Sequence, residues 1–278
     1  MIPAEFDYVA PSSLDEALSA LREGGEDAKI LAGGHSLIPL MKLRLAAPTL
    51  LVDLRKVPGL DGISRDNGTI RLGSMVRHHA VATGGFGLPS MAAATIADQQ
   101  VRNMGTIGGT LAHGDPASDL PAILLAHEGS VVLRGAGGER EVAAADFFED
   151  YLTTVVSEDE ILTEVRIPAL DGYGYGYHKF NRRQEDWAMV AVGAAVKVSG
   201  GVVEDVRIGL THMSSVPLRA TASEEALRGK PATPENIAAA AELAADGTEP
   251  PADLNASQDY KRHLARVLTR RALEDASQ

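Results

Sequence analysis

The chain has 278 residues, of which 45% are hydrophobic and none is cysteine, and its formal net charge is −12. The length predicts about two domains, and the hydrophobic content is sufficient for buried cores. The acidic charge excludes a general nucleic-acid binder, because neutralising phosphates requires clustered Lys and Arg. The absence of cysteine excludes disulfides, a cysteine nucleophile and cysteine-ligated iron–sulfur clusters within the chain. The eight histidines show no metal-site spacing, so we expect no metal.

The sequence gives no sign of a membrane span or of export. No stretch approaches the roughly 20 apolar residues that cross a bilayer. Residues 1–7 lack the basic and then apolar pattern of a secretory signal. We therefore expect a cytoplasmic protein.

The N-terminal part has the pattern of a small β-α-β unit. Ser13 and Glu16 form a capping-box pattern that predicts a helix over residues 14–23, ended by Gly24 and Gly25. The unit itself is predicted from a strand at 29–32, a helix at 37–43 and a second strand at 49–53.

From Gly62 onward, short β runs alternate with helices, which indicates an α+β fold. Strands are predicted at 69–72, 130–133 and 161–167. Helices are predicted at 77–82, 88–97 and 120–126.

A glycine-rich stretch, 171–176, predicts a linker and a domain boundary. We expect a domain in two parts, 1–58 and 59–172, and a second domain at 173–278. In the last domain, apolar strands at 189–198 and 202–210 predict an antiparallel hairpin. Helices are predicted at 234–245 and 259–273.

Two double-glycine motifs are candidate diphosphate sites: Ala-Gly-Gly-His-Ser at 32–36 and Thr-Ile-Gly-Gly-Thr at 106–110. We expect both to be sharp turns at strand ends, because glycine tolerates positive φ and lets a ligand approach the backbone. Successive N–H groups in such turns form an anion nest without a lysine or arginine. Either motif alone is more typical of a plain turn.

The residues that flank the glycines favour a ligand. The Ser36 hydroxyl and the amides of the following helix would face the same anion, and His35 serves either the ligand or the turn itself. Asp115 and Ser118 have an alternative role as caps of the next helix. Side chains that could bond ribose, ribityl or ring atoms follow the second motif: Thr110, Asp115, Ser118 and Asp119.

With these motifs extended over 32–45 and 106–121, the chain resembles the FAD-binding medium subunits of the molybdenum hydroxylases, the xanthine dehydrogenase family. The aerobic carbon monoxide dehydrogenase flavoproteins are the most similar branch by motif. The resemblance covers nearly the whole chain. It implies a two-part FAD-binding domain of the vanillyl-alcohol oxidase (PCMH) type, followed by a C-terminal domain of an antiparallel sheet and helices.

The resemblance also implies a site for non-covalent FAD. Asp119 matches a family acid near the ribityl and ring region. Lys179 matches a family lysine near the isoalloxazine, where a cation could stabilise the anionic reduced flavin. Without the resemblance, Lys179 is more typical of a surface charge at a strand edge. Many relatives carry Asn at the position of Thr110. The threonine hydroxyl offers one fewer hydrogen-bonding group than the asparagine amide. The expected cofactor-binding residues are Leu31, Ala32, Gly33, Gly34, His35, Ser36, Leu37, Thr106, Ile107, Gly108, Gly109, Thr110, Asp115, Ser118, Asp119, Leu162 and Lys179.

The implied function is an electron-transfer subunit of an oxidoreductase. The family has molybdopterin on a large partner subunit and two [2Fe–2S] clusters on a small one, assembled as a dimer of heterotrimers. Electrons would pass through FAD to a quinone, cytochrome, oxygen or NAD. The partners could hold the chain at the inner face of the membrane. Carbon monoxide, purines and N-heterocycles all remain open as substrates, and the likeness of the motifs favours carbon monoxide.

Two alternatives stay open. A self-sufficient FAD oxidase or reductase would bind a small organic substrate against the flavin. The lack of a long lid insertion and the aromatic content of 4% disfavour it, although Tyr151, Phe180 and Trp187 remain available. An assembly subunit without flavin would show eroded motifs. Two further groups have structural interpretations: Tyr173, Tyr175 and Tyr177 in an edge or linker strand, and Lys261, Arg262, His263, Arg266, Arg270 and Arg271 on a solvated face or subunit contact.

Overall fold

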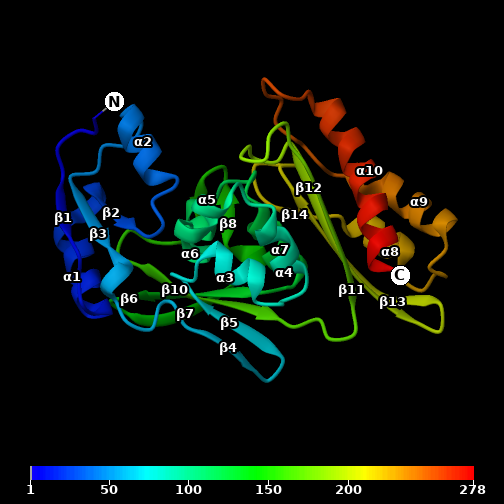
Figure 1. Cartoon of the computed structure of the whole chain (residues 1–278), viewed down its shortest axis with the longest axis horizontal. Coiled ribbons are helices and arrows are strands. Elements are labelled where there is room, and N and C mark those ends of the chain that lie inside the picture. The colour runs from blue at the N-terminus through cyan, green and yellow to red at the C-terminus, as the bar shows by residue number, and fades with distance from the viewer. Residues whose placement is uncertain (1) are drawn as a thin grey trace.

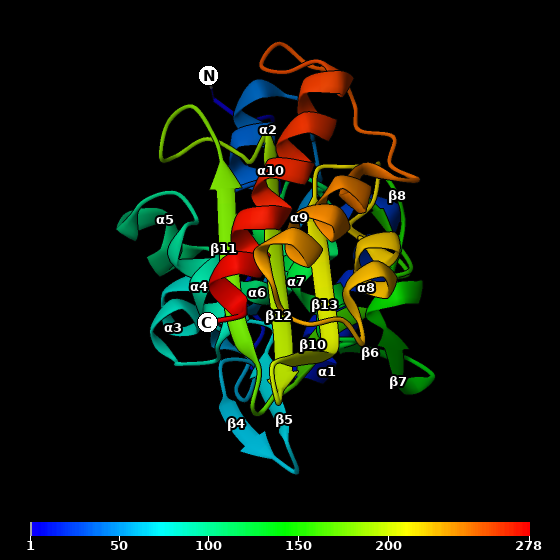
Figure 2. The same cartoon turned by 90° about the vertical axis from the view of Figure 1, so that its right-hand side faces the viewer.

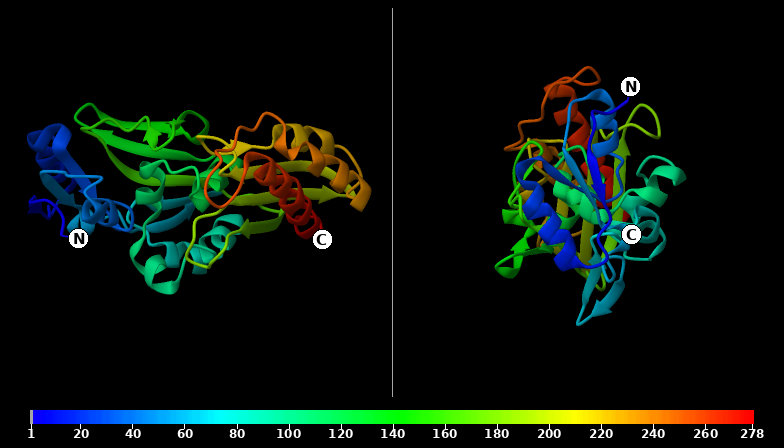
Figure 3. Two further views of the ribbon diagram at one scale, coloured as in Figure 1. Left: turned by 90° about the horizontal axis from the view of Figure 1, so that it is seen from above. Right: turned by 90° about the vertical axis from the view of Figure 1, so that its left-hand side faces the viewer.

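In the described part of the chain, the strands form three main sheets and one two-stranded ribbon, and the three parts follow one another along the long axis of the molecule (Figures 1 and 3). The computed structural model describes residues 2–278. Helices and strands alternate irregularly and the two larger sheets are antiparallel, which confirms the α+β class. No helix among the described residues is both long and apolar enough to cross a bilayer.

The N-terminal part is a three-stranded parallel sheet in the order β1-β3-β2. Its strands are β1 (Asp7–Val9), β2 (Ala28–Leu31) and β3 (Leu50–Asp53). Helix α1 (Leu14–Gly24) begins at the Ser13 cap, whose side chain accepts from the Glu16 amide, and helix α2 (Leu37–Leu43) joins β2 to β3. The predicted β-α-β unit is confirmed. The short exposed strand β1 was not predicted, because three residues carry no periodic pattern.

The middle part is built on a five-stranded antiparallel sheet in the order β4-β5-β10-β6-β7. Its strands are β4 (Ile63–Asp66), β5 (Thr69–Gly73), β6 (Ser130–Gly135), β7 (Gly138–Ala143) and β10 (Ile161–Pro168). The ribbon consists of β8 (Phe148–Asp150) and β9 (Thr153–Thr154). The helices of this part are α3 (His78–Thr83), α4 (Leu88–Ala94), α5 (Gln99–Met104), α6 (Ile107–His113) and α7 (Asp119–Ala126).

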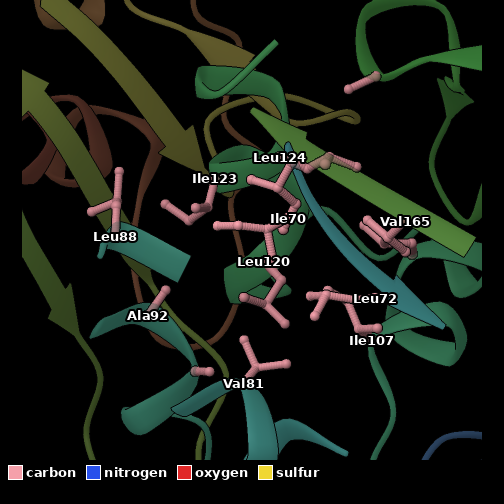
Figure 4. Close-up of a cluster of buried hydrophobic side chains, with 14 of the residues drawn as sticks. Ile70, Leu72, Val81, Leu88, Ala92, Ile107, Leu120, Ile123, Leu124 and Val165 are labelled. Atoms are coloured by element: carbon pink, nitrogen blue, oxygen red, sulfur yellow. The ribbon is translucent and has the colours of Figure 1, made fainter. Parts of the chain in front are cut away.

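Helix α7 joins the middle part to the C-terminal part. It is apolar around its whole circumference, as expected of a helix that is buried on all sides. Leu120 and Leu124 belong to the core around Ile70 and Val165, which Figure 4 shows. On its other side, Ile123 reaches the C-terminal sheet, where a Cβ added at Gly193 would lie 2.4 Å from Ile123 Cδ1.

The C-terminal part is a four-stranded antiparallel sheet in the order β11-β12-β13-β14, with helix α10 lying across it (Figure 2). Its strands are β11 (Gly174–Phe180), β12 (Val190–Ser199), β13 (Val202–Thr211) and β14 (Leu218–Arg219). Its helices are α8 (Thr221–Leu227), α9 (Pro234–Glu242) and α10 (Gln258–Ala276). The predicted β12–β13 hairpin is confirmed.

Two structural expectations need correction. The stretch predicted as a linker is strand β11 from Gly174 onward, because its glycines let α10 approach: a Cβ at Gly176 would lie 2.1 Å from the Ala272 carbonyl oxygen. Lys261 is fully buried and pairs with Asp253, so it is not part of a solvated face. Helices α5, α6 and α8 were not predicted. The boundaries at residues 58 and 172 stay predictions.

Candidate functional site

A cavity of about 710 Å³ opens where the N-terminal sheet, the α5–α6 region and strand β11 meet. Its size falls within the range of small-molecule and cofactor sites. The residues that line its wall come from all three parts of the chain, from Leu21 in the N-terminal part to Trp187 in the C-terminal part. Both glycine motifs lie in this wall.

The two glycine motifs pack directly against each other. A Cβ at Gly33 would lie 2.5 Å from the Met104 carbonyl oxygen and 2.8 Å from Gly105 Cα. A Cβ at Gly109 would lie 3.5 Å from Ala32 Cβ. Gly33 is therefore required for the close approach of two backbones, and a valine there would separate the motifs as well as disturb any ligand.

The first motif follows β2 as a turn, as predicted, and it presents free amides. Gly34 has φ +76°, a conformation that favours glycine. Within residues 2–278, the N–H groups of Gly34, His35 and Ser36 donate to no protein acceptor, and all three residues line the cavity. Successive free amides of this kind are the donor set of an anion nest.

The second motif is not the predicted turn. Gly108 and Gly109 lie in the first turn of α6, and the Thr106 side chain caps that helix by accepting from the Gly109 amide at 3.1 Å. The Ile107 and Gly108 amides donate to the Val76 and Ser74 carbonyls. The motif therefore contributes cavity wall rather than a second set of free amides.

The structure brings together most of the predicted site residues. The following line the cavity: Ala32, Gly33, Gly34, His35, Ser36, Leu37, Thr106, Gly109, Thr110, Ser118, Asp119 and Lys179. The remaining five have other surroundings. Leu31, Ile107 and Leu162 are buried in hydrophobic clusters, and Gly108 packs against Ser74. Asp115 accepts from the Ala117 amide, so its side chain fixes the turn before α7.

Lys179 and Asp119 form a buried ion pair at the cavity. Lys179 Nζ lies 2.9 Å from Asp119 Oδ2, and the two side chains are 5% and 4% exposed. The Tyr177 hydroxyl donates to Asp119 Oδ1 at 2.7 Å. Burial and the carboxylate raise the pKa of Tyr177 well above 10, so the phenol is protonated. The interpretation of Lys179 as a surface charge is wrong.

The wall contains two other buried polar side chains, those of His78 and Ser118. Burial, together with the nearby His35 and Arg77, lowers the pKa of His78 to about 4, and its ring packs against Gly105. Ser118 occupies the N-cap position of α7, yet its buried hydroxyl has no hydrogen-bond partner among residues 2–278. The alternative role as a side-chain cap therefore does not apply to Ser118.

Sequence reasoning missed the part of the wall that lies around β9. In the loop after β11, Trp187 also lines the cavity and is 53% exposed. From the sequence this tryptophan was considered only as a ring for a substrate, not as part of a cofactor site. The segment around β9 carries no motif. Its lining residues are Leu152, Thr153, Thr154, Val156, Ser157, Glu158 and Glu160.

Two family models cover the chain. Residues 4–170 match the FAD binding domain in molybdopterin dehydrogenase, and residues 175–276 match the CO dehydrogenase flavoprotein C-terminal domain. The chain belongs to the FAD-binding medium subunits of the molybdenum hydroxylases. It is thus a flavoprotein subunit of an oxidoreductase, and the expected FAD-binding domain followed by a sheet-and-helix domain is confirmed.

Similarity to individual medium subunits extends over the full length. The chain is 41% identical to the carbon monoxide dehydrogenase medium chain of Hydrogenophaga pseudoflava, over 99% of this chain and 98% of the relative. It is 36% identical to the glyceraldehyde dehydrogenase medium chain of Sulfolobus acidocaldarius, over 100% of both. A solved structure of carbon monoxide dehydrogenase from Hydrogenophaga pseudoflava, which lacks the Mo-pyranopterin moiety, matches with a TM-score of 0.96 and 43% identity, covering 99% of this chain and 98% of that one.

Proposed function

We propose that this medium subunit binds FAD non-covalently in the cavity and passes electrons from the [2Fe–2S] clusters of a partner subunit to an external acceptor. The observation that carries the proposal is the row of free amides at Gly34, His35 and Ser36 in the wall of a cavity of about 710 Å³. A diphosphate is the part of FAD that such a donor set suits, and the acidic chain needs no lysine or arginine for it.

Different residues of the wall would hold different parts of the cofactor. The amides of the first motif would hold the diphosphate, and the α6 residues Gly109 and Thr110 would form the surface beside it. Asp119 and Lys179 would face the ribityl and ring portion. When bound, FAD supplies one- and two-electron transfer, which none of this chain's side chains can perform. The protein's own contribution is therefore binding, orientation and the charge presented to the cofactor.

The other redox centres belong to partners in this proposal. The chain has no cysteine, so it cannot ligate an iron–sulfur cluster through thiolates. Full-length similarity to medium chains supports a large and a small subunit as partners. By the family resemblance, the large subunit would carry molybdopterin and the small one the iron–sulfur clusters, in a dimer of heterotrimers. The acceptor would be a quinone, a cytochrome, oxygen or NAD. Through its partners, a cytoplasmic chain could lie at the inner face of the membrane.

Carbon monoxide is the substrate that we propose for the holoenzyme. The support is the 41% identity to a carbon monoxide dehydrogenase medium chain. The glyceraldehyde dehydrogenase medium chain is 36% identical, so the medium subunit alone discriminates weakly between substrates. Substrate chemistry would take place on the large subunit. Assays of the purified holoenzyme with carbon monoxide, glyceraldehyde and an N-heterocycle would identify the substrate.

The cofactor proposal is tested by the absorbance spectrum of the purified chain and by chromatography of the acid-released flavin. Ala112 is exposed on α6 and lines the cavity, so Ala112→Glu adds bulk and negative charge there without disturbing a core. We expect FAD affinity to fall by about tenfold or more, which corresponds to about 1.4 kcal/mol.

Ala239→Glu is the matched control, because Ala239 is also exposed on a helix, α9, and lies outside the cavity wall. It should bind FAD as the wild type does. Equal FAD affinity in both variants would contradict the placement of FAD in this cavity. Failure of the wild-type chain to take up FAD, alone and in complex, would contradict the function itself.

The partner proposal is tested by isolating the tagged chain from its native cells under conditions that preserve complexes. We expect a large molybdenum-containing subunit and a small iron–sulfur subunit to be recovered with it in equal amounts. Recovery of the chain alone with FAD would favour a self-sufficient oxidase or reductase instead.

A further inference from the structure

Strand β11 places two side chains on one face, two residues apart, toward helices α4 and α7. Side chains at alternate positions of a strand share a face, so Tyr177 and Lys179 both point to the first residue of α7, Asp119. The opposite face of the strand is occupied by α10, which packs on Gly174 and Gly176. The strand is therefore packed between helices on both faces, which fixes the positions of the Tyr177 and Lys179 side chains.

These three side chains share one carboxylate. Asp119 accepts from the Tyr177 phenol on Oδ1 and from the Lys179 ammonium on Oδ2, at 2.7 and 2.9 Å. Lys179 Nζ also lies 3.5 Å from the Thr95 carbonyl oxygen at the end of α4. Asp119 and Lys179 line the cavity, whereas Tyr177 stands behind them and does not.

We infer that Tyr177 is a positioning residue that sets the charge Asp119 and Lys179 present to the flavin, and so helps to set its reduction potential. The inference rests on the proposed binding of FAD in this cavity. It adds a residue to which the cofactor proposal gives no role.

The electrostatic potential at the wall depends on both partners of Asp119. Lys179 balances the charge of the carboxylate, and the positive end of the Tyr177 O–H dipole also points at it, so the phenol makes the potential there less negative. Electrostatic interactions are strong in a site with low exposure to water. Removing the hydroxyl leaves a more negative wall beside a group that gains electrons on reduction. The reduced flavin is then less stable, and its midpoint potential is lower.

The test is a spectroelectrochemical titration of bound FAD in the purified protein. We expect Tyr177→Phe to retain stoichiometric FAD and to show a lower midpoint potential than the wild type. Tyr175→Phe is the matched control, because Tyr175 lies on the same strand and its hydroxyl donates to the Leu170 carbonyl instead. Its potential should equal that of the wild type.

Lys179→Gln provides an independent measurement if Tyr177→Phe does not fold. It removes the cation while keeping a hydrogen-bond donor, so its potential should lie below that of Tyr177→Phe. A wild-type potential in either variant would overturn the inference, as would an equal shift in Tyr175→Phe. Loss of FAD from Tyr177→Phe would overturn it too, since the phenol would then serve binding. A wild-type chain without FAD contradicts the proposed function before this comparison begins.

Discussion

His127 is a buried histidine outside the cavity that couples protonation to folding. It lies at the end of α7, is 1% exposed, and its Nδ1 is 2.9 Å from the Pro168 carbonyl oxygen. Nδ1 therefore carries the proton, and Nε2 has no partner among residues 2–278. Burial, together with the nearby Arg207, lowers the pKa of His127 to about 4.

Because the folded pKa of His127 is below the unfolded value, the unfolded chain binds this proton first as the pH falls. The stability from neutral His127 is complete above about pH 6.5 and is lost progressively down to about pH 4, with a maximum near 3 kcal/mol. We expect the melting temperature of wild-type protein to fall across this interval. His127→Gln, which keeps a donor for Pro168, should show a shallower fall.

The control for this prediction is His263→Gln, which removes an exposed histidine on α10. Melting curves at half-unit pH steps give the comparison. If His127→Gln and the wild type lose stability in parallel between pH 6.5 and 4, His127 does not carry the effect.

Single residues also show where sequence reasoning stops. The polar residues of the first motif could be predicted as site residues because glycine, a short polar side chain and a helix start are local signals. Lys261 could not be predicted as buried, because its partners come from elsewhere: Asp253 in the preceding loop at 2.7 Å and His212 beyond β13 at 3.3 Å. The helical pattern around a lysine is the same whether the partner is water or a carboxylate.

At the scale of elements, the packing of α10 on β11 depends on two glycines that have no side chain to separate them. A Cβ at Gly176 would lie 2.1 Å from the Ala272 carbonyl oxygen, which is helix backbone and cannot move alone. We expect Gly176→Ala to lower stability by about 1–3 kcal/mol, the usual cost of overpacking. The measurement is the melting temperature, which should fall by several degrees.

Gly137→Ala is the matched control, because a Cβ there would meet no heavy atom within 4 Å and the backbone is not in the left-handed region. It should leave the melting temperature unchanged or slightly higher. An unchanged melting temperature in Gly176→Ala would show that α10 can shift without cost.

Elements with strong local signals could be predicted, and those defined by packing could not. Helix α2 and the β12–β13 hairpin follow the predicted residues closely because an apolar period and a glycine turn mark them. Helices α5 and α6 are short and adjacent, and α6 contains two glycines in its first turn. Glycines disfavour a helix in isolation, so tertiary contacts with Ser74 and Ala32 decide the conformation.

At the scale of the whole molecule, the proposed cofactor would bridge parts of the chain that have separate hydrophobic clusters. The N-terminal sheet, the middle part and the C-terminal sheet each contribute wall to the cavity. A ligand that binds only the folded state stabilises it by about 2.7 kcal/mol at a hundredfold excess over Kd. We expect added FAD to raise the melting temperature of the apoprotein, with a shift that grows with the logarithm of FAD concentration.

Riboflavin is the informative control ligand, because it carries the ring system without the diphosphate that the first motif would hold. At equal concentration its shift should be clearly smaller than that of FAD. Equal shifts in melting temperature with FAD and riboflavin would show that the first motif does not contribute to binding. The absence of any shift with FAD would argue against the cavity as its site.

The cavity as a whole was only partly predictable. Both motifs and Asp119 were identified from the residues themselves and Lys179 from the family resemblance, whereas the segment around β9 was not identified. That segment lies more than a hundred residues after the first motif, and only the topology of the middle sheet brings it to the same wall. Tyr177 was assigned to an edge or linker strand and lies in the edge strand β11, but its hydrogen bond to Asp119 depends on the position of α7.

The wide spread of the cavity wall along the sequence also bears on how the protein is made. Lining residues run from Leu21 to Trp187, so about two-thirds of the chain must leave the ribosome before the wall is complete. Early parts of a chain begin to fold during synthesis, at about 5–20 residues per second. The parallel sheet around β2 can form long before strand β11 exists. Cofactor loading is therefore a late event in the life of the nascent chain, after the C-terminal sheet has begun to emerge.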